Sequence, residues 1–201
     1  SQYYRASLSG KSNKTSYYLA LGFNDDQGII KQTNVSKHDI RLNLNQDITD
    51  KIKLKSNTFF SSVSTSMISG TDKLANTRSS IVRHMISFKP LRGTDPDEGF
   101  YDEDLTGPDA WFKDYDDDSR DNMFNTNLTL DIKPLKWLTF QLKGGMVYRN
   151  KERSLWYGTS LYNGAQTNGK AGISTAATRA YTGEALMMFN HTFNKDHNLS
   201  G

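Results

Sequence analysis

A strict alternation of apolar and polar residues in short segments constrains the fold of this chain more than any other feature. From Phe124 to Ile132, the even-numbered positions carry Phe, Thr, Leu or Ile, and the odd-numbered positions carry Asn, Thr or Asp. Residues 40–45 and 138–149 largely follow the same two-residue period. Because successive side chains of a β-strand point to opposite faces, each segment predicts a strand with one apolar and one polar face.

Further segments are weaker strand candidates, because aromatic and β-branched residues are frequent in them but their faces are harder to assign. They are residues 3–9, 16–23, 52–64 and 181–193, and another strand is expected to begin at Asn198. Together these patterns predict an all-β chain of about eight antiparallel strands. The full-length strands are expected near residues 2–9, 15–23, 37–47, 52–65, 122–133, 137–152 and 178–193.

The connections between these segments alternate between short and long. Short connections, rich in turn-forming residues, lie at 10–14, 47–51, 133–137 and 194–197. Long connections lie at 24–37, 67–122 and 154–172. Up-and-down barrels of outer membranes have short periplasmic turns and longer extracellular loops, so the spacing predicts a barrel of this kind. Aromatic residues near the short turns fit a membrane-boundary girdle, although the rim of a soluble β-sandwich would also carry them: Tyr17, Tyr18, Trp137 and Phe193.

Composition excludes several other classes of protein. No run of about 18 apolar residues is present, which excludes a helical membrane protein. A mean hydropathy of -0.69 does not exclude a membrane barrel, because barrel strands alternate between lipid-facing and lumen-facing residues. Cysteine is absent, which excludes disulfides, thiolate metal sites and Cys nucleophiles.

No motif for catalysis or cofactor binding is complete in the sequence. Gly10-Lys11-Ser12 resembles the end of a phosphate-binding loop, but the position that requires the first glycine holds Arg5, so a hairpin turn is the better interpretation. Histidines 38, 84, 191 and 197 lie in separate segments without metal-ligand spacing. No Gly-x-Ser-x-Gly elbow occurs, and we therefore expect no enzyme, no cofactor and no metal.

Charge is distributed unevenly along the chain. Twelve of the 22 acidic residues lie between Asp95 and Asp121, opposed by only Lys113 and Arg120. The alternating acids from Asp114 lack the glycine and glutamate of an EF-hand, although an irregular calcium site stays open. Charge is costly at the membrane midplane, so residues 93–121 are predicted to form an extracellular lobe. Elsewhere Lys and Arg are scattered singly, and no nucleic-acid interface is predicted.

Aromatic residues in the long connections are the candidates for ligand binding. Flat apolar faces beside hydrogen-bonding groups suit sugar rings and peptide side chains. The residues selected on this ground are Tyr101, Trp111, Tyr115, Trp156 and Tyr157. The alternative is that they pack the long connection against itself, since a loop of this length needs a small core of its own.

An ordered succession of short strings resembles the barrel strands of SusC/RagA-type TonB-linked outer-membrane proteins. In the first half these strings are Leu8-Ser9-Gly10, residues 13–18, Leu21-Gly22-Phe23, residues 26–30 and Arg41 to Asn45. In the second half they are Leu128 to Ile132, Pro134 to Leu138, Phe189-Asn190 and His197-Asn198-Leu199. Lys11 departs from the glycine that is common in the first turn of the family, which affects only the turn geometry.

The resemblance implies a transmembrane barrel of about 22 strands closed by a plug, with long extracellular loops. Residues 1–201 would then be an internal part of the barrel, without plug, TonB-contacting segment or the remaining strands. It also implies TonB-dependent uptake of oligosaccharides or peptides across the outer membrane of a Gram-negative, Bacteroidetes-like cell envelope. The implied partners are the lipid bilayer, the TonB complex through parts outside this segment, and a SusD-like surface lipoprotein. The polar faces, including Arg41, Asn43, Asn127 and Lys143, would line the lumen or face the plug.

Two other classes of protein stay open at this point. A small complete barrel with a structural or adhesive role would require Asn198 to pair with Gln2 and close the ring. A soluble β-sandwich binding module would require the apolar rows to pack against a second sheet. The transporter hypothesis instead predicts that one face carries a large exposed apolar patch, formed by Leu42, Leu44, Leu128, Leu130, Phe140 and Leu142.

Overall fold

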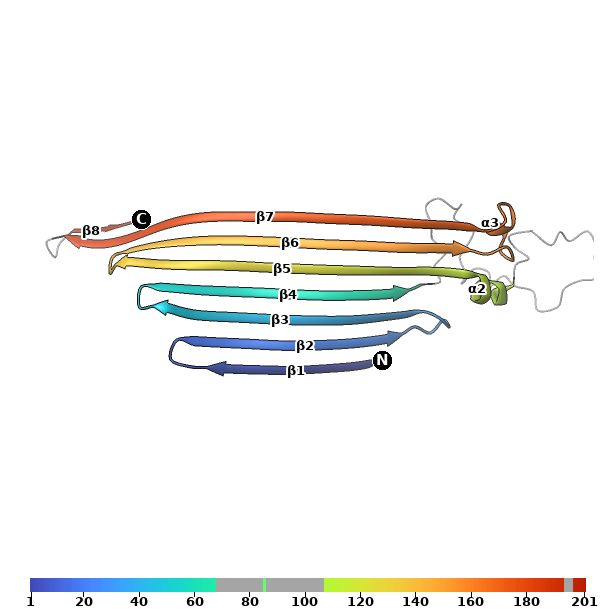
Figure 1. Cartoon of the computed structure of the whole chain (residues 1–201), viewed down its shortest axis with the longest axis horizontal. Coiled ribbons are helices and arrows are strands. Elements are labelled where there is room, and N and C mark those ends of the chain that lie inside the picture. Colours follow the sequence, from blue (N-terminus) through green and yellow to red (C-terminus); the bar gives the residue numbers. More distant parts are fainter. Residues whose placement is uncertain (68–84, 86–106, 194–196) are drawn as a thin grey trace, which may run out of the picture.

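Eight strands form one antiparallel sheet in the order of the sequence (Figure 1). This computed structural model describes residues 1–67, 85, 107–193 and 197–201. The strands are β1 (Gln2–Lys11), β2 (Thr15–Gln27), β3 (Asn34–Thr49), β4 (Ile52–Ser66), β5 (Tyr115–Leu135), β6 (Leu138–Tyr157), β7 (Lys170–Phe193) and β8 (His197–Ser200). Two short helices, α2 (Pro108–Asp114) and α3 (Tyr162–Ala165), lie in the connections. The predicted all-β, up-and-down fold is confirmed.

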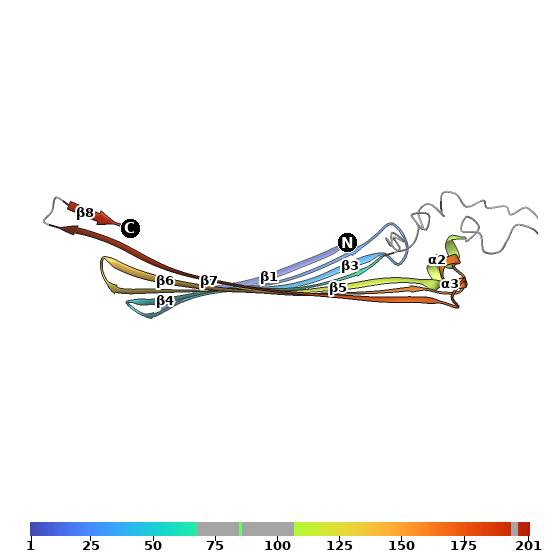
Figure 2. The same cartoon turned by 90° about the horizontal axis from the view of Figure 1, so that it is seen from above.

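The alternation of short and long connections is also confirmed. The turns at residues 12–14, 50–51 and 136–137 lie at one end of the sheet. The connections at 28–33 and 158–169 lie at the other end, together with α2 and α3 (Figure 1). We call these the turn end and the loop end. Viewed from the edge, the strands form a single twisted layer, with both helices on one side of it (Figure 2).

The strands extend further toward the loop end than the sequence predicted. Residues 93–121 were predicted to form an extracellular lobe and not a strand. Residues 93–106 lie outside the described residues, and α2 lies in a connection as predicted. For residues 115–121 the prediction is wrong, because they form the first third of β5. Residues 154–157 likewise belong to β6. Two acids of this region pair with arginines of β6: Asp117 with Arg153 and Asp121 with Arg149. Charge was taken to exclude a strand, but charged residues are accommodated here by pairing between neighbouring strands.

The strand register places the predicted apolar residues on a single face. Directly opposed residues of antiparallel strands share a face, and Leu44, Ser56, Leu128 and Gly144 are opposed in one row. Leu42, Leu130, Phe140 and Leu142 lie in rows of the same parity. None of the six predicted residues is buried, and Leu128 is 47% exposed. The prediction of one apolar face is therefore confirmed. Four of the six residues are exposed as predicted, and Leu44 and Leu130 are partly exposed.

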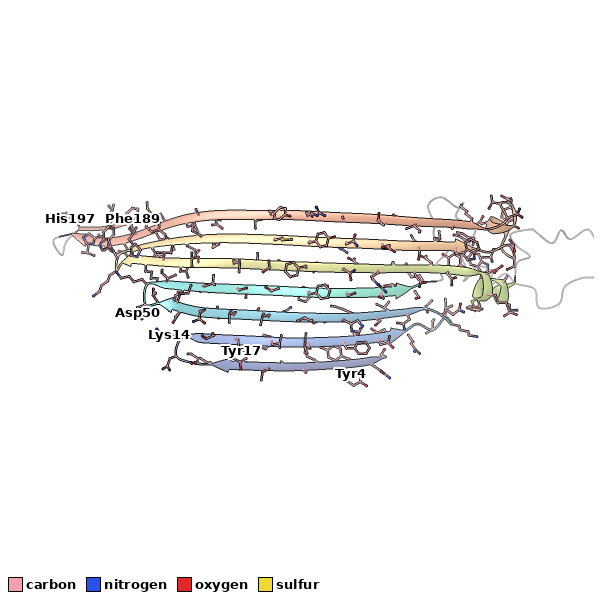
Figure 3. The ribbon with its side chains drawn as sticks, viewed as in Figure 1. Tyr4, Lys14, Tyr17, Asp50, Phe189 and His197 are labelled. Atoms are coloured by element: carbon pink, nitrogen blue, oxygen red, sulfur yellow. The ribbon has the colours of Figure 1, made fainter. Side chains whose placement is uncertain are left out.

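The opposite face of the sheet is polar. Asn43, Asn57 and Asn127 are opposed to one another in a row across β3, β4 and β5. The rows on either side of it contain Arg41 and Lys143. Side chains extend from the strands along their whole length (Figure 3). The strands thus divide into two chemically different surfaces, which we call the apolar face and the polar face.

Neither rival architecture fits the described residues. Within them, β1 pairs only with β2, and β8 pairs only with β7, so the strands do not close a ring. The apolar face has no second sheet against it, because all strands belong to one sheet. No helix in the described part of the chain is long and apolar enough to span a membrane.

Candidate functional site

The described part of the chain has one cluster of buried apolar side chains, and it lies at the loop end. Trp111 of α2, Tyr115 of β5, Tyr157 of β6 and Leu161 are each at most 3% exposed. The ring centroids of Trp111 and Tyr115 are 5.1 Å apart, and those of Tyr115 and Tyr157 are 5.0 Å apart. Tilted and edge-to-face contacts of this kind stabilise aromatic pairs beyond the area they bury. The cluster fixes α2 against the sheet.

The cluster belongs to the polar side of the sheet. Tyr115 and Tyr157 are directly opposed, and their parity is that of Asn127 and Lys143. Trp111 and Leu161 therefore cover the polar face at the loop end, in agreement with the position of both helices in Figure 2. From here on, "the lobe" means α2 together with the connection 158–169, which contains α3, and no longer the predicted range 93–121. In a barrel the lobe would lie over the interior at its mouth.

Local sequence explains the position of α2. Pro108 lies in the first turn, where its fixed φ and missing N–H are tolerated. Asp109 lies near the positive N-terminus of the helix dipole and Lys113 near its negative C-terminus. Gln32 donates a hydrogen bond of 2.9 Å to the carbonyl oxygen of Phe112, which joins the connection 28–33 to the end of the helix.

A buried ion pair lies beneath the aromatic cluster. Asp117 has a fully buried side chain and accepts two hydrogen bonds from Arg153, both of 2.7 Å. The hydroxyl of Tyr115 donates a hydrogen bond of 3.2 Å to the same carboxylate. A buried carboxylate requires such partners, because an unpaired charge away from water is strongly destabilising. The pair therefore joins β5 and β6 where the lobe begins.

Asp114 attaches the end of α2 to the connection that follows β6. Its carboxylate accepts a hydrogen bond of 2.9 Å from the Ser160 amide and another from the Ser160 hydroxyl. Its carbonyl oxygen accepts a bond of 2.7 Å from the Gly158 amide. The side-chain and backbone hydrogen bonds from Ser160 lower the pKa of Asp114 below its usual value, since they favour the charged form.

The structure brings together three of the five predicted ligand-binding residues and separates a fourth. Trp111, Tyr115 and Tyr157 form the buried cluster, as the packing alternative expected. Trp156 lies on the apolar face, 42% exposed, where an ideal Cβ on Gly169 would be 2.7 Å from its ring. Tyr101 lies outside the described residues. Ligand contact by these residues stays a prediction.

Sequence reasoning missed the residues that support the cluster. Nothing in the sequence indicated that Leu161 is buried, because its burial depends on the chain folding back after β6. The cations Arg149, Lys151 and Arg153 alternate with a period of two and could have indicated that the strand continues, but the acids of 114–121 show no such period. No group of three or more metal-ligating side chains occurs among the described residues.

Comparisons with known proteins agree with this geometry. No family model matches the chain. A curated relative, the TonB-dependent receptor P3 of Formosa agariphila, is 22% identical over 199 residues, which cover 96% of this chain and 20% of that protein. The solved structure of the RagAB peptide transporter is 18% identical and has a TM-score of 0.70, covering 98% of this chain and 23% of its own. The RagAB peptide importer in its open-open state also gives a TM-score of 0.70, with 18% identity and coverage of 98% and 22%.

These similarities confirm the resemblance to TonB-linked proteins of the SusC/RagA type at the level of the fold. The sheet matches part of the RagA barrel, and it is open. The chain spans about a fifth of the length of the curated relative it matches.

Proposed function

We propose, from the fold that this chain shares with the RagA barrel, that residues 1–201 form one wall segment of a TonB-dependent transporter in a Gram-negative outer membrane. The observation that carries the proposal is the pair of opposed surfaces on one open sheet. A soluble protein rarely leaves so large an apolar surface exposed, whereas a lipid-facing wall requires it. The remaining strands and the plug would belong to other parts of the transporter.

The height of the apolar face fits a membrane. On β5, outward positions from Phe124 to Ile132 are apolar or Thr, and they span about 27 Å at ~3.4 Å per residue. Outer-membrane barrels carry an apolar band of about 25 Å. Beyond Phe124 the same face carries Asn122 and Arg120, which need water. The lipid bilayer is therefore the proposed partner of the apolar face.

Transport would not require any bond to change in this segment. The polar face would line the interior, and a plug moved by the TonB complex would open a path along it. Toward the turn end of this face, charged groups are paired, as in the ion pairs Lys55–Asp131 and Lys143–Glu184, which suits a surface buried against a plug. Oligosaccharides or peptides are the proposed substrates, and a SusD-like lipoprotein would cover the mouth.

The lobe would shape the entrance to this path. Trp111, Tyr115 and Tyr157 are proposed to act first by holding α2 over the polar face, because their rings are buried. Trp156 has an exposed ring above the membrane band and is available to a surface partner. Tyr101, in the same long connection as α2, is proposed to contribute to ligand contact.

The test is transport by the full-length protein in a strain that lacks its gene. Restoring the wild-type gene should restore growth on a peptide or oligosaccharide mixture, and deletion of TonB should abolish it. Trp111→Ala should reduce uptake while the protein still reaches the outer membrane. Removing this buried ring leaves a cavity that destabilises the packing of α2 on the sheet by about 3–5 kcal/mol. The exposed Trp156→Ala is the matched control for the loss of one indole.

Two results would contradict the proposal. One is growth that does not depend on the gene or on TonB. The other is a full-length protein that is found in a soluble fraction.

A further inference from the structure

A group of cations lies on the polar face, on the mouth side of the asparagine row. We call this group the cationic belt, and its members are Arg5, Lys37, Arg41, Arg149 and Lys151. They lie in three adjacent rows of opposed residues on the polar face. From β1 to β6 the belt crosses five strand spacings, about 24 Å at ~4.8 Å each. It therefore lies just inside the proposed mouth, below the lobe.

The carboxylates in these rows do not balance the belt. The rows contain two, Asp39 and Asp121, so five cations leave a net charge of +3. Asp121 already accepts hydrogen bonds of 2.9 and 3.1 Å from Arg149. No ion pair within the described residues involves the other four cations, which are Arg5, Lys37, Arg41 and Lys151.

The four belt cations that form no ion pair with a described residue are widely spaced, although Lys151 lies directly opposite Asp121. Lys37 and Lys151 lie in one row, three strand spacings or about 14 Å apart. Lys37 and Arg41 lie on one strand, four residues or about 14 Å apart at ~3.4 Å per residue. Of the four, only Arg41 has an aromatic contact, 5.5 Å above the Phe59 ring. The next row toward the turn end carries no charge and contains Asn43, Asn57 and Asn127.

We infer that the cationic belt selects acidic peptides in extended form, a step that rests on the proposed transport function. An extended peptide with acidic residues four positions apart carries carboxylates about 14 Å apart, which matches the belt in both directions. Amide side chains donate and accept hydrogen bonds, so the adjacent asparagine row suits the N–H and C=O groups of a peptide backbone. The net positive charge at the mouth raises the local concentration of anionic substrates.

The experiment measures uptake by cells that express the full-length transporter. The acidic probe is a fluorescent six-residue Ser/Gly peptide with Glu at its first and fifth positions, and the neutral probe has Gln there. Wild type should take up the acidic probe at least about tenfold faster than the neutral probe. The difference between the two rates should shrink as salt screens the charges. Trigalacturonate is the acidic oligosaccharide probe.

The variants distinguish the effect of losing a belt lysine from the effect of losing a positive charge elsewhere in the chain. Lys151→Gln should slow uptake of the acidic probe roughly fivefold, and Lys37→Gln with Lys151→Gln roughly 25-fold, if two distant sites act additively. Uptake of the neutral probe should not change. Lys136→Gln, in the turn 136–137, is the matched control and should leave both rates unchanged.

Several outcomes overturn the inference. Equal uptake of both peptides by wild type would overturn it while leaving the transport function intact, as would transport of trigalacturonate without the acidic peptide. The inference also fails if the double variant lowers thermal stability without changing the preference for the acidic probe, because the belt then holds the plug. Failure to import any probe or nutrient would overturn the transport function itself.

Discussion

At the scale of single residues, attachment of the lobe depends on the buried carboxylate of Asp117. Asp117→Ala would leave Arg153 without its bidentate partner beneath the aromatic cluster. Breaking one side of a fully buried ion pair costs about 3–5 kcal/mol. Because the Arg153 side chain is 33% exposed and regains water, we expect a loss of about 2–3 kcal/mol. Amides of α2 and the ends of β5 and β6 should therefore exchange roughly 30- to 150-fold faster. Hydrogen exchange of the full-length protein in bilayers measures this directly.

The matched control is Asp47→Ala at the turn end. Asp47 pairs with Lys53 at 3.3 Å, but both side chains are more than 40% exposed. Exposed ion pairs contribute about 0–1 kcal/mol, so exchange should change less than about fivefold. Equal effects of the two substitutions would show that the Asp117 pair does not hold the lobe.

Asp114 makes the attachment of α2 sensitive to acid. Hydrogen bonds from Ser160 lower the pKa of Asp114 in the folded state, so its contribution is complete above the unfolded pKa. The contribution is lost as pH falls below 3.8, the ordinary pKa of an aspartate, and through the lower folded pKa. A nitroxide on Lys113→Cys should therefore become more mobile in that acidic range.

In the Ser160→Ala variant, which loses the hydroxyl donor, the increase in nitroxide mobility should begin at a higher pH. An identical pH profile in both proteins would contradict this role of Ser160.

At the same scale, sequence could select the aromatic residues but not their roles. Trp111, Tyr115 and Tyr157 were chosen because aromatic rings in a long connection bind ligands or pack a core. The parity of Tyr157 and Trp156 puts these neighbours on opposite faces, which becomes visible only when β6 is known to continue to residue 157. Burial then depends on contacts between α2 and β6, which are distant in sequence.

At the scale of elements, two adjacent glycines of β6 report on the two faces. An ideal Cβ on Gly145 would lie 2.4 Å from the Thr182 hydroxyl and 2.7 Å from the Asn127 side chain on the polar face. An ideal Cβ on Gly144, on the apolar face, meets no atom within 4 Å. Gly145→Ala should destabilise β6 by about 1 kcal/mol or more, through displacement of its neighbours.

Gly144→Ala should be neutral or stabilising by about 0.4–1 kcal/mol, because it restricts the unfolded chain without a clash. Urea-induced unfolding of the full-length protein in bilayers compares the two variants. Equal destabilisation by both would contradict the assigned faces of β6.

The strands were predictable because one apolar and one polar face impose a two-residue period over most of their length. Their ends at the loop end were not, because polar and charged residues occupy both faces there. In residues 115–121 acids stand on both faces, and the arginines that pair with Asp121 and Asp117 lie on β6, 28 and 36 residues away in sequence. Charge was taken as a sign of a loop, although ion pairs between neighbouring strands accommodate it.

At the scale of the whole molecule, the account depends on which face meets lipid. Alternation and the lengths of the connections predicted an up-and-down barrel wall, and the single open sheet with opposed faces agrees with it. Sequence could not choose among barrel segment, closed small barrel and sandwich. That choice depends on whether the edges pair and the apolar face is covered, which are properties of the assembled sheet.

The most direct test places nitroxides on single cysteines at four positions of the full-length protein in bilayers: 127, 128, 142 and 143. The 201 residues contain no native cysteine to interfere. Labels at Leu128 and Leu142 should be relaxed mainly by oxygen, which concentrates in lipid. Labels at Asn127 and Lys143 should be relaxed less by oxygen and more by a water-soluble nickel complex. The same accessibility at all four positions, or the reverse pattern, would contradict the assignment of the apolar face to lipid.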